Sequence, residues 1–454
     1  MASRVLDRFP WLADQTRVLL GSTIRRRVAS GAFWGLVSGL AVRMCSVIAS
    51  FLIARILGRR GFGEYGIIFS TVLLINSLAG LGIGVTATKY IAEFRQTDPA
   101  RAGRIVGMST ILTLFSSGLY ALGLLAFAPW LAEKTLAAPQ LTGLLRLSTI
   151  CAILGVFSGV QASALAGFEA FKSTAIVGLL AGCLQAVLAV IGCWVAGLPG
   201  VILGMTLSYA VATFGNHFLL RREMRRFGIQ VNWGKSLDEW RILRQFSIPA
   251  FLGTAMVAPV FWVCTAMLAN QPNGYDELGI FNAANQWYTA VLFLPGVLGT
   301  AILPVLSERH GAGDTLATLR VMKGMMKLTA VIVVPIVVIV CLFSKMIMAG
   351  YGASFVSGHW TLALTAVTAG LLAVVAPVGQ VIAASGRMWT GFLMNAGWAF
   401  ILIAGSATMS HWGANGIAGG RLLAYGVHTI WVSVFVFHLF RDHPAAGPLA
   451  GGDQ

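Results

Sequence analysis

Long apolar stretches separated by short polar segments run through almost the whole chain. A helix needs about 20 apolar residues to cross the hydrocarbon of a bilayer. We count twelve such stretches, near residues 31–56, 65–88, 104–131, 142–167, 174–197, 200–220, 246–269, 278–304, 324–348, 359–385, 389–409 and 414–440. Hydrophobic residues fill 57% of the 454 positions and charged residues 11%, whereas soluble domains carry about 25% charge. The pattern predicts an all-α polytopic membrane protein with twelve transmembrane helices.

The basic residues fall mostly on one side of this predicted membrane protein. Of the 32 Lys and Arg residues, 24 lie in the two tails and the even-numbered connections, five in the odd-numbered connections, and three inside spans. Because Lys and Arg accumulate in cytoplasmic loops, we expect both termini to be cytoplasmic. The same distribution accounts for the net charge of +16 without a nucleic-acid partner.

The longest connection, residues 221–245, divides six predicted spans from six. Its basic residues, with Trp233 and Trp240, predict an amphipathic linker lying on anionic membrane lipids. The basic tail at residues 1–30 is similar in character. Orientation of the chain and adhesion to the membrane surface explain both segments.

A short repeat relates the two parts of the chain. GEYGIIFS follows the first predicted span, and DELGIFNA follows the seventh. We therefore expect a six-helix lobe over residues 31–220, a second over residues 246–440 and a cytoplasmic tail over residues 441–454. Two lobes related by a repeat would bind a substrate between them.

Arginines, and no carboxylates, lie inside the predicted spans. Arg43 is near the middle of the first span, Arg146 is in the fourth and Arg421 in the twelfth, while Lys89 closes the second. All sixteen acidic residues fall in tails, connections or span ends. An unpaired charge in hydrocarbon is costly, so these cations are expected to line a central cationic cavity that receives an anion such as a phosphate. Arg146 and Arg421 could instead reach the nearer interface with their long side chains.

The start of the eighth span carries a polar strip. Asn282, Asn285 and Gln286 share one helical face, and Trp287 follows them. Amides bond sugar hydroxyls and aromatic rings stack on sugar faces, so the strip is a candidate carbohydrate contact. Hydrogen bonding between helices and an interfacial aromatic belt explain the same residues.

Two prolines in the seventh span, Pro249 and Pro259, are candidate hinges, because proline loosens the helical hydrogen-bond ladder. The sequence contains no phosphate-binding loop, no HExxH motif and no tight pair of carboxylates within a span. We expect no cofactor and no metal site. Transport fits these features better than catalysis.

Several segments resemble a known family. ARILGRRGFGEYGIIFS, LAGLGIGVTATKYIAEFRQ, SALAGFEAFK, ELGIFNAANQWYTAVLFLPGVLGTAILPVLSER and QVIAASGR are similar to blocks of the bacterial polysaccharide transporters. These are the O-antigen (Wzx-type) flippases of the MOP (multidrug/oligosaccharidyl-lipid/polysaccharide) exporter superfamily. The resemblance extends over nearly the whole chain.

The resemblance implies two six-helix bundles that rock between inward-open and outward-open states in the bacterial inner membrane. It implies a flippase that moves undecaprenyl-pyrophosphate-linked oligosaccharide from the cytoplasmic to the periplasmic leaflet, alongside polysaccharide polymerase machinery. The related lipid II flippases carry arginines in the first helix, where Arg43 lies, but typically have fourteen spans.

Two alternatives stay open. The first is an ion-coupled multidrug exporter, whose relatives have twelve spans but rely on buried carboxylates. The second is a membrane glycan polymerase or ligase, which would normally carry a large periplasmic loop with catalytic residues.

Overall fold

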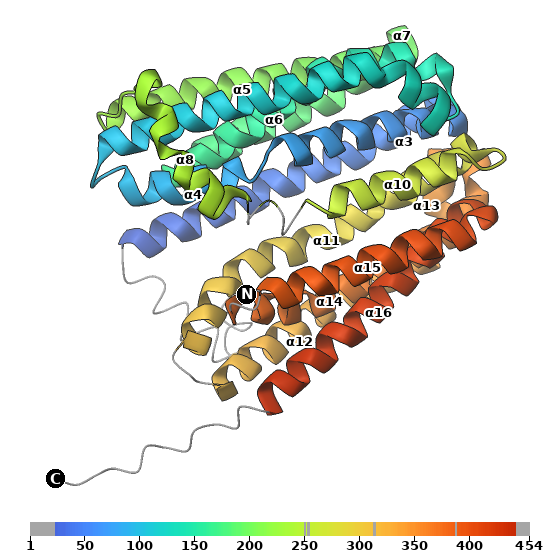
Figure 1. The fold of residues 1–454 in the computed structure, drawn as a ribbon. Helices are drawn as coiled ribbons and strands as arrows, with labels where there is room; N and C mark the ends of the chain where they lie inside the picture. Colours follow the sequence, from blue (N-terminus) through green and yellow to red (C-terminus); the bar gives the residue numbers. More distant parts are fainter. Residues whose placement is uncertain (1–22, 249–250, 252–254, 312–314, 386–387, 442–454) are drawn as a thin grey trace.

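The computed structural model describes residues 23–248, 251, 255–311, 315–385 and 388–441, and within these ranges every regular element is helical (Figure 1). The prediction of an all-α protein is confirmed. The helices are α3 (Thr23–Ala79), α4 (Ile83–Phe94), α5 (Pro99–Trp130), α6 (Thr142–Gly167), α7 (Phe171–Arg226), α8 (Trp240–Ile242), α10 (Val257–Ala269), α11 (Gly274–Gly311), α12 (Thr315–Leu342), α13 (Ser344–Tyr351), α14 (His359–Ala384), α15 (Met388–Met409) and α16 (Gly413–Arg441). Six short 3-10 or π segments join them: η1 (Leu131–Thr135), η2 (Pro139–Leu141), η3 (Trp233–Glu239), η4 (Leu243–Ser247), η5 (Ala353–Gly358) and η6 (Ser410–Trp412).

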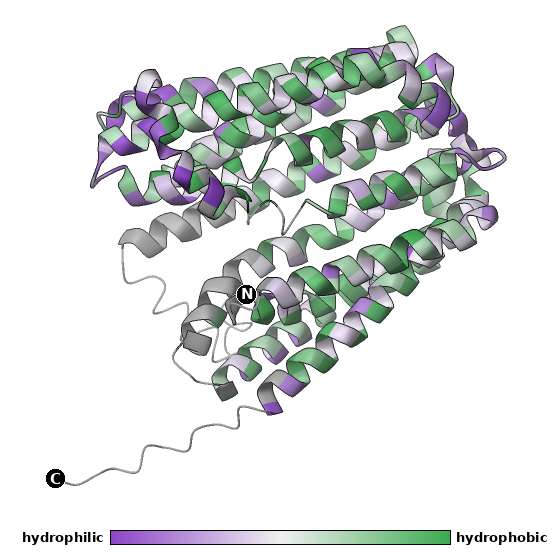
Figure 2. Cartoon of the chain, viewed as in Figure 1, coloured by the Kyte–Doolittle hydropathy of each residue, from purple (hydrophilic) through white to green (hydrophobic). Residues whose placement is uncertain are grey.

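The long helices run side by side, and their polar residues gather at the two ends of the bundle (Figure 2). In the described residues, seven helical stretches are long and apolar enough to cross a membrane. Inside hydrocarbon no water can satisfy backbone N–H and C=O groups, so helices that satisfy their own backbone form there. This explains why the apolar runs of the sequence become helices.

Two of the long elements are helices joined across a sharp bend. In α3 the bend is at Gly58, which has a φ of 70°. In α7 it is at residues 196–197, and beyond it Gly200 packs on the backbone of Gly192. Because residues before and after the bend touch, the two arms of α7 run back along each other.

The second predicted span, residues 65–88, is wrong in its last part. Helix α3 ends at Ala79, and α4 starts at Ile83 after a break. Within the break, Leu81 and Gly82 have positive φ values of 43° and 68°. A side chain at position 82 would collide with the carbonyl oxygen of Ser247, so this position requires glycine.

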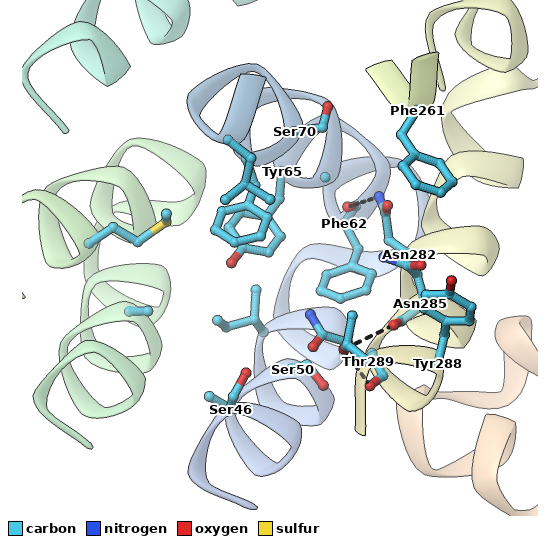
Figure 3. A pocket seen from close by; sticks show the side chains of 18 of the residues that line it. Ser46, Ser50, Phe62, Tyr65, Ser70, Phe261, Asn282, Asn285, Tyr288 and Thr289 are labelled. Carbon is cyan, nitrogen blue, oxygen red and sulfur yellow. Dashed lines mark hydrogen bonds between the residues drawn. The ribbon is translucent and has the colours of Figure 1, made fainter. Parts of the chain in front are cut away.

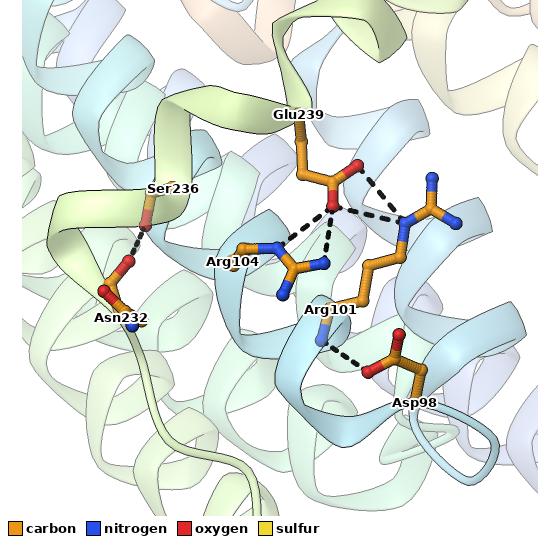
Figure 4. Close-up of polar contacts among 6 residues, drawn as sticks. All are labelled: Asp98, Arg101, Arg104, Asn232, Ser236 and Glu239. Atoms are coloured by element: carbon orange, nitrogen blue, oxygen red, sulfur yellow. Dashed lines mark hydrogen bonds and ion pairs between the residues drawn. The ribbon is translucent and has the colours of Figure 1, made fainter.

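The predicted linker between the two lobes begins in the last residues of α7, continues into the short elements η3, α8 and η4, and is fixed to α5 by one carboxylate. Glu239 accepts hydrogen bonds from Nε of Arg101 at 3.2 Å and from Nε and Nη2 of Arg104 at 3.1 and 3.0 Å (Figure 4). A little farther on, the hydroxyls of Ser247 and Thr86 are 2.6 Å apart. The linker is therefore held against α4 and α5.

Candidate functional site

A cavity of about 640 Å³ lies between α3, α7, α10, α11 and α16. Both arms of α3 line it, because the bend at Gly58 returns the chain along the same space. Its polar lining residues are Arg43, Ser46, Ser50, Tyr65, Ser70, Ser77, Gln185, Tyr209, Trp262, Thr265, Asn282, Asn285, Gln286, Tyr288, Thr289 and Arg421. Figure 3 shows side chains of α3 and α11 pointing toward this space, with Phe261 of α10 beside them.

Arg43, on the first arm of α3, is half-buried in the cavity wall. Its Nη1 donates to the hydroxyl of Thr289 on α11 at 3.1 Å. Because a hydroxyl carries no charge, this bond does not neutralise the guanidinium, and most of its five N–H donors stay available to a ligand.

Arg421, on α16, is the most deeply buried cation of the site, with 3% of its surface exposed. Nη1 donates to Oδ1 of Asn285 at 2.8 Å, while the Nε atom is buried without a partner. The guanidinium lies 3.5 Å from the ring centroid of Tyr288 and 4.6 Å from that of Phe261. Aromatic faces stabilise a cation without neutralising it.

The hydrogen-bond partners of the two arginines lie on consecutive turns of α11. Asn285 and Thr289 are four residues apart on α11, which is about 6 Å along a helix axis. No Asp or Glu is among the described residues that line the cavity. Two guanidinium groups therefore face one cavity, and their hydrogen-bond partners are neutral. An anionic group with several acceptor oxygens would supply the missing negative charge and accept hydrogen bonds from both.

The predicted polar strip lies in this cavity. Asn282, Asn285 and Gln286 all line it, and Nδ2 of Asn282 donates to the carbonyl of Phe62 at 3.3 Å. Trp287 points elsewhere: it packs at the edge of a hydrophobic cluster, with its ring 6.4 Å from that of Phe51.

Two other predicted cations lie outside the cavity. Arg146 is exposed on α6. Lys89 is exposed on α4, and its ammonium lies 4.7 Å from the ring of Tyr90 and 4.3 Å from that of Phe246. The structure therefore brings together Arg43 and Arg421 and leaves Arg146 and Lys89 apart from them.

The candidate hinge Pro259 is the third residue of α10. A proline in the first turn removes no hydrogen bond within α10, and its role as a hinge stays a prediction. Pro249 lies outside the described residues.

Sequence reasoning missed Thr289 and Phe261. Thr289 continues the helical spacing of Asn282, Asn285 and Gln286, so extending that strip by one turn would have found it. Phe261 carries no polar signal and depends on how α10 packs against α16. Among the described residues, no group of His, Cys, Asp and Glu is arranged to hold a metal ion.

Helices α3 and α11 are in close contact at Gly63 and Gly279, next to the cavity-lining residues Phe62 and Phe281. A Cβ at Gly63 would collide with the carbonyl of Tyr275, and one at Gly279 with the carbonyl of Arg59. Nη2 of Arg59 also donates to Oε1 of Glu277 at 3.1 Å. The other carboxylate oxygen of Glu277 accepts the N–H of Ala414 at 2.8 Å, at the start of α16.

Helices long and apolar enough to cross a bilayer, packed around an internal cationic cavity, are typical of multi-pass membrane transport proteins. The family comparison is more specific. The chain belongs to the polysaccharide biosynthesis protein family, whose model matches residues 28–310.

Individual relatives agree with this assignment. The chain is 25% identical over 402 residues to the "EPS I polysaccharide export inner membrane protein EpsE" of Ralstonia solanacearum, covering 87% of this chain and 90% of that protein. It is 25% identical to the "Lipid III flippase" of Escherichia coli (strain K12) over 285 residues, 62% of this chain and 67% of that one.

Solved structures share the fold. An "inward-facing conformation of a multidrug resistance MATE family transporter of the MOP superfamily" superposes with a TM-score of 0.76 at 15% identity, covering 91% of this chain and 100% of that one. An "outward-facing conformation" of such a transporter gives 0.67 at 15% identity, over 95% and 99% of the two chains.

Proposed function

We propose that this protein is a flippase for undecaprenyl-pyrophosphate-linked oligosaccharide, which it carries from the cytoplasmic to the periplasmic leaflet of the inner membrane. The observation that carries the proposal is the pair Arg43 and Arg421, both lining one cavity that has no carboxylate among its described lining residues. A pyrophosphate supplies the missing negative charge and enough oxygens to accept from both guanidinium groups. The amides of α11 would contact the adjoining sugar.

Twelve crossings in two lobes belong to the proposal. Seven stretches are long and apolar enough to cross, and three of these contain a reversal: at Gly58, at Gly197 and at Gly413. Seven plus three gives ten crossings, and α10 and α11 would add two. The six-helix lobes would be residues 31–220 and 246–440, with both termini cytoplasmic as the Lys and Arg distribution predicts.

The transport cycle would be alternating access between these lobes. Contact between α3 and α11 at Gly63 and Gly279 supports an inward-open state, closed at the periplasmic end. The higher TM-score to the inward-facing than to the outward-facing neighbour, 0.76 against 0.67, points the same way. Because the cavity would open to one side of the membrane at a time, the anion would cross while bound to Arg43 and Arg421, and the lobes would shield it from the hydrocarbon.

The experiment uses a bacterial strain that depends on this protein, with its lipid-linked oligosaccharides extracted and their leaflet probed. Arg43→Ala and Arg421→Ala are expected to leave complete units facing the cytoplasm. Losing hydrogen bonds to a charged group costs about 1.5–3 kcal/mol each, roughly 10- to 100-fold in affinity. Arg146→Ala is the matched control, because it removes the same charge from an exposed position outside the cavity.

Full transport by well-expressed Arg43→Ala and Arg421→Ala variants would overturn the proposal. Resistance to cationic drugs on expression would favour a multidrug exporter instead, as in the MATE neighbours that share the fold. A cavity with two cations and no described carboxylate is poorly suited to bind such drugs.

A further inference from the structure

A second hollow lies on the far side of α10 from the central cavity. It is a groove of about 530 Å³ between η1, α10 and the end of α15. Lys134, Thr135, Asn270, Gln271 and Ser410 supply its polar groups. These residues lie near the end of the bundle where α3 and α11 touch, since Tyr275, one residue into α11, donates to the carbonyl of Leu136 just after η1.

One side chain, Trp262, lines both hollows. Helix α10 turns one face to the central cavity, with Phe261 and Thr265, and the other to the groove, with Met267 and Asn270. Trp262 lies at the boundary of these faces, so its indole is part of the wall between the two spaces.

The wall is tied to the first half of the chain by two hydrogen bonds. Nε1 of Trp262 donates to the hydroxyl of Thr71 on α3 at 2.9 Å. Nδ2 of Asn270 donates to the carbonyl of Thr135 in η1 at 2.7 Å. Moving α10 away from α3 and η1 would break both bonds and join the groove to the cavity.

The chemistry of the groove suits a saccharide. The amide nitrogens are already engaged, that of Asn270 with Thr135 and that of Gln271 with the hydroxyl of Ser410 at 3.1 Å. The amide oxygens, which accept from sugar hydroxyls, and the second N–H of Gln271 remain for a ligand. Lys134 adds an exposed ammonium, and the Trp262 ring offers an aromatic face for a sugar ring.

We infer that this groove is a second saccharide site, which the sugar part of the substrate occupies once it has passed Trp262, and that Trp262 separates it from the central cavity. The inference rests on the proposed function, because the ligand is the glycan of the same lipid-linked substrate. It adds a site that is distinct from the arginine pair and lies on the exit side.

The separation is tested by thiol labelling with a membrane-impermeant maleimide added from the periplasmic side, measured above the background of the unmodified chain. Met267→Cys places a thiol in the groove and is expected to react readily. Thr265→Cys places one in the cavity and is expected to react slowly. Adding Trp262→Ala should accelerate labelling at position 265 several-fold, while adding Trp262→Phe, which keeps a ring, should not.

Ligand binding is tested on the purified Met267→Cys protein. The probe is the oligosaccharide released by mild acid from the lipid-linked pool of the same cells. It should slow labelling at position 267, and adding Gln271→Leu should abolish this protection. Dextran fragments of equal size serve as the control for non-specific shielding.

Each outcome decides the inference. An unreactive thiol at position 267, equal labelling at position 265 with and without Trp262, or no protection by the oligosaccharide would overturn it. None of these results tests the flippase proposal, which is tested separately by the leaflet measurement with Arg43→Ala and Arg421→Ala.

Discussion

Gly63 of α3 and Gly279 of α11 make the same contact from opposite sides, each packing on the carbonyl of the residue four positions before the other glycine. The carbonyls belong to Tyr275 and Arg59. The helices therefore cross with a local two-fold relationship, backbone against backbone. Both glycines come from the repeated motifs GEYG and DELG, although the motifs align Gly66, rather than Gly63, with Gly279.

A methyl group at either glycine should force α3 and α11 apart. We expect Gly63→Ala and Gly279→Ala to destabilise the closed end by about 1–3 kcal/mol, as overpacking does, and to lower the Tm of the purified protein. Gly118→Ala in α5 is the control, because a Cβ there meets open space and alanine favours the helix. Unchanged Tm values for both variants would show that the contact is not tight.

Glu277 joins three helices at that same end, and its loss should weaken all three. Glu277→Ala leaves Arg59 and the N–H of Ala414 without their acceptor, at a cost of about 1–3 kcal/mol. Glu277→Gln keeps one acceptor oxygen and places an NH2 group at the other position, so it retains one of the two hydrogen bonds and is expected to cost less than alanine. Thermal unfolding ranks the variants, with Asp276→Ala as the neighbouring control, and equal Tm values for the two alanine variants would contradict the assignment.

The linker is expected to detach when its carboxylate is removed. Glu239 lies between Arg101 and Arg104 with 10% of its side chain exposed, so Glu239→Ala leaves two cations without a counter-charge. Trypsin should then cut at Lys235 and Arg241 faster than in the parent protein. Asp238→Ala is the control one residue away, and identical cleavage rates for both variants would contradict this role.

The sequence predicted the helical class, because runs of about 20 apolar residues leave the backbone no other solution in a membrane. It did not predict the break at residues 80–82. Within LAGLGIG, Gly82 packs on the carbonyl of Ser247, a residue far along the chain, and sequence alone does not reveal such a contact.

The same limit applies to the arginines. Arg43, Arg146 and Arg421 each stand alone in an apolar span, and sequence spacing does not say which way an isolated side chain faces. Arg421 is buried because Phe261 and Tyr288, from two other helices, cover its guanidinium, whereas α6 exposes Arg146. Trp287 directly follows the polar strip in sequence but lies outside the cavity lining. Consecutive residues of a helix point to different sides, so Trp287 does not share the face of Gln286.

Changing Asn285 to aspartate should separate the stability of the site from its function. Asn285 accepts a hydrogen bond from Arg421 at 2.8 Å through a neutral amide. The nearly isosteric Asn285→Asp supplies a carboxylate at the same place, forming a charge-assisted pair that competes with the phosphate of the substrate. We expect the purified variant to match or exceed the parent protein in Tm, while lipid-linked oligosaccharide accumulates facing the cytoplasm.

Asn285→Leu is the companion variant, since it removes the amide and leaves Arg421 charged but unsupported. It should lower the Tm, because the buried guanidinium loses a hydrogen bond worth about 1.5–3 kcal/mol, and transport should fall with stability. A fully active Asn285→Asp protein would mean that Arg421 does not bind the anion. The two variants thus distinguish an arginine kept free for its substrate from one that serves only to hold helices together.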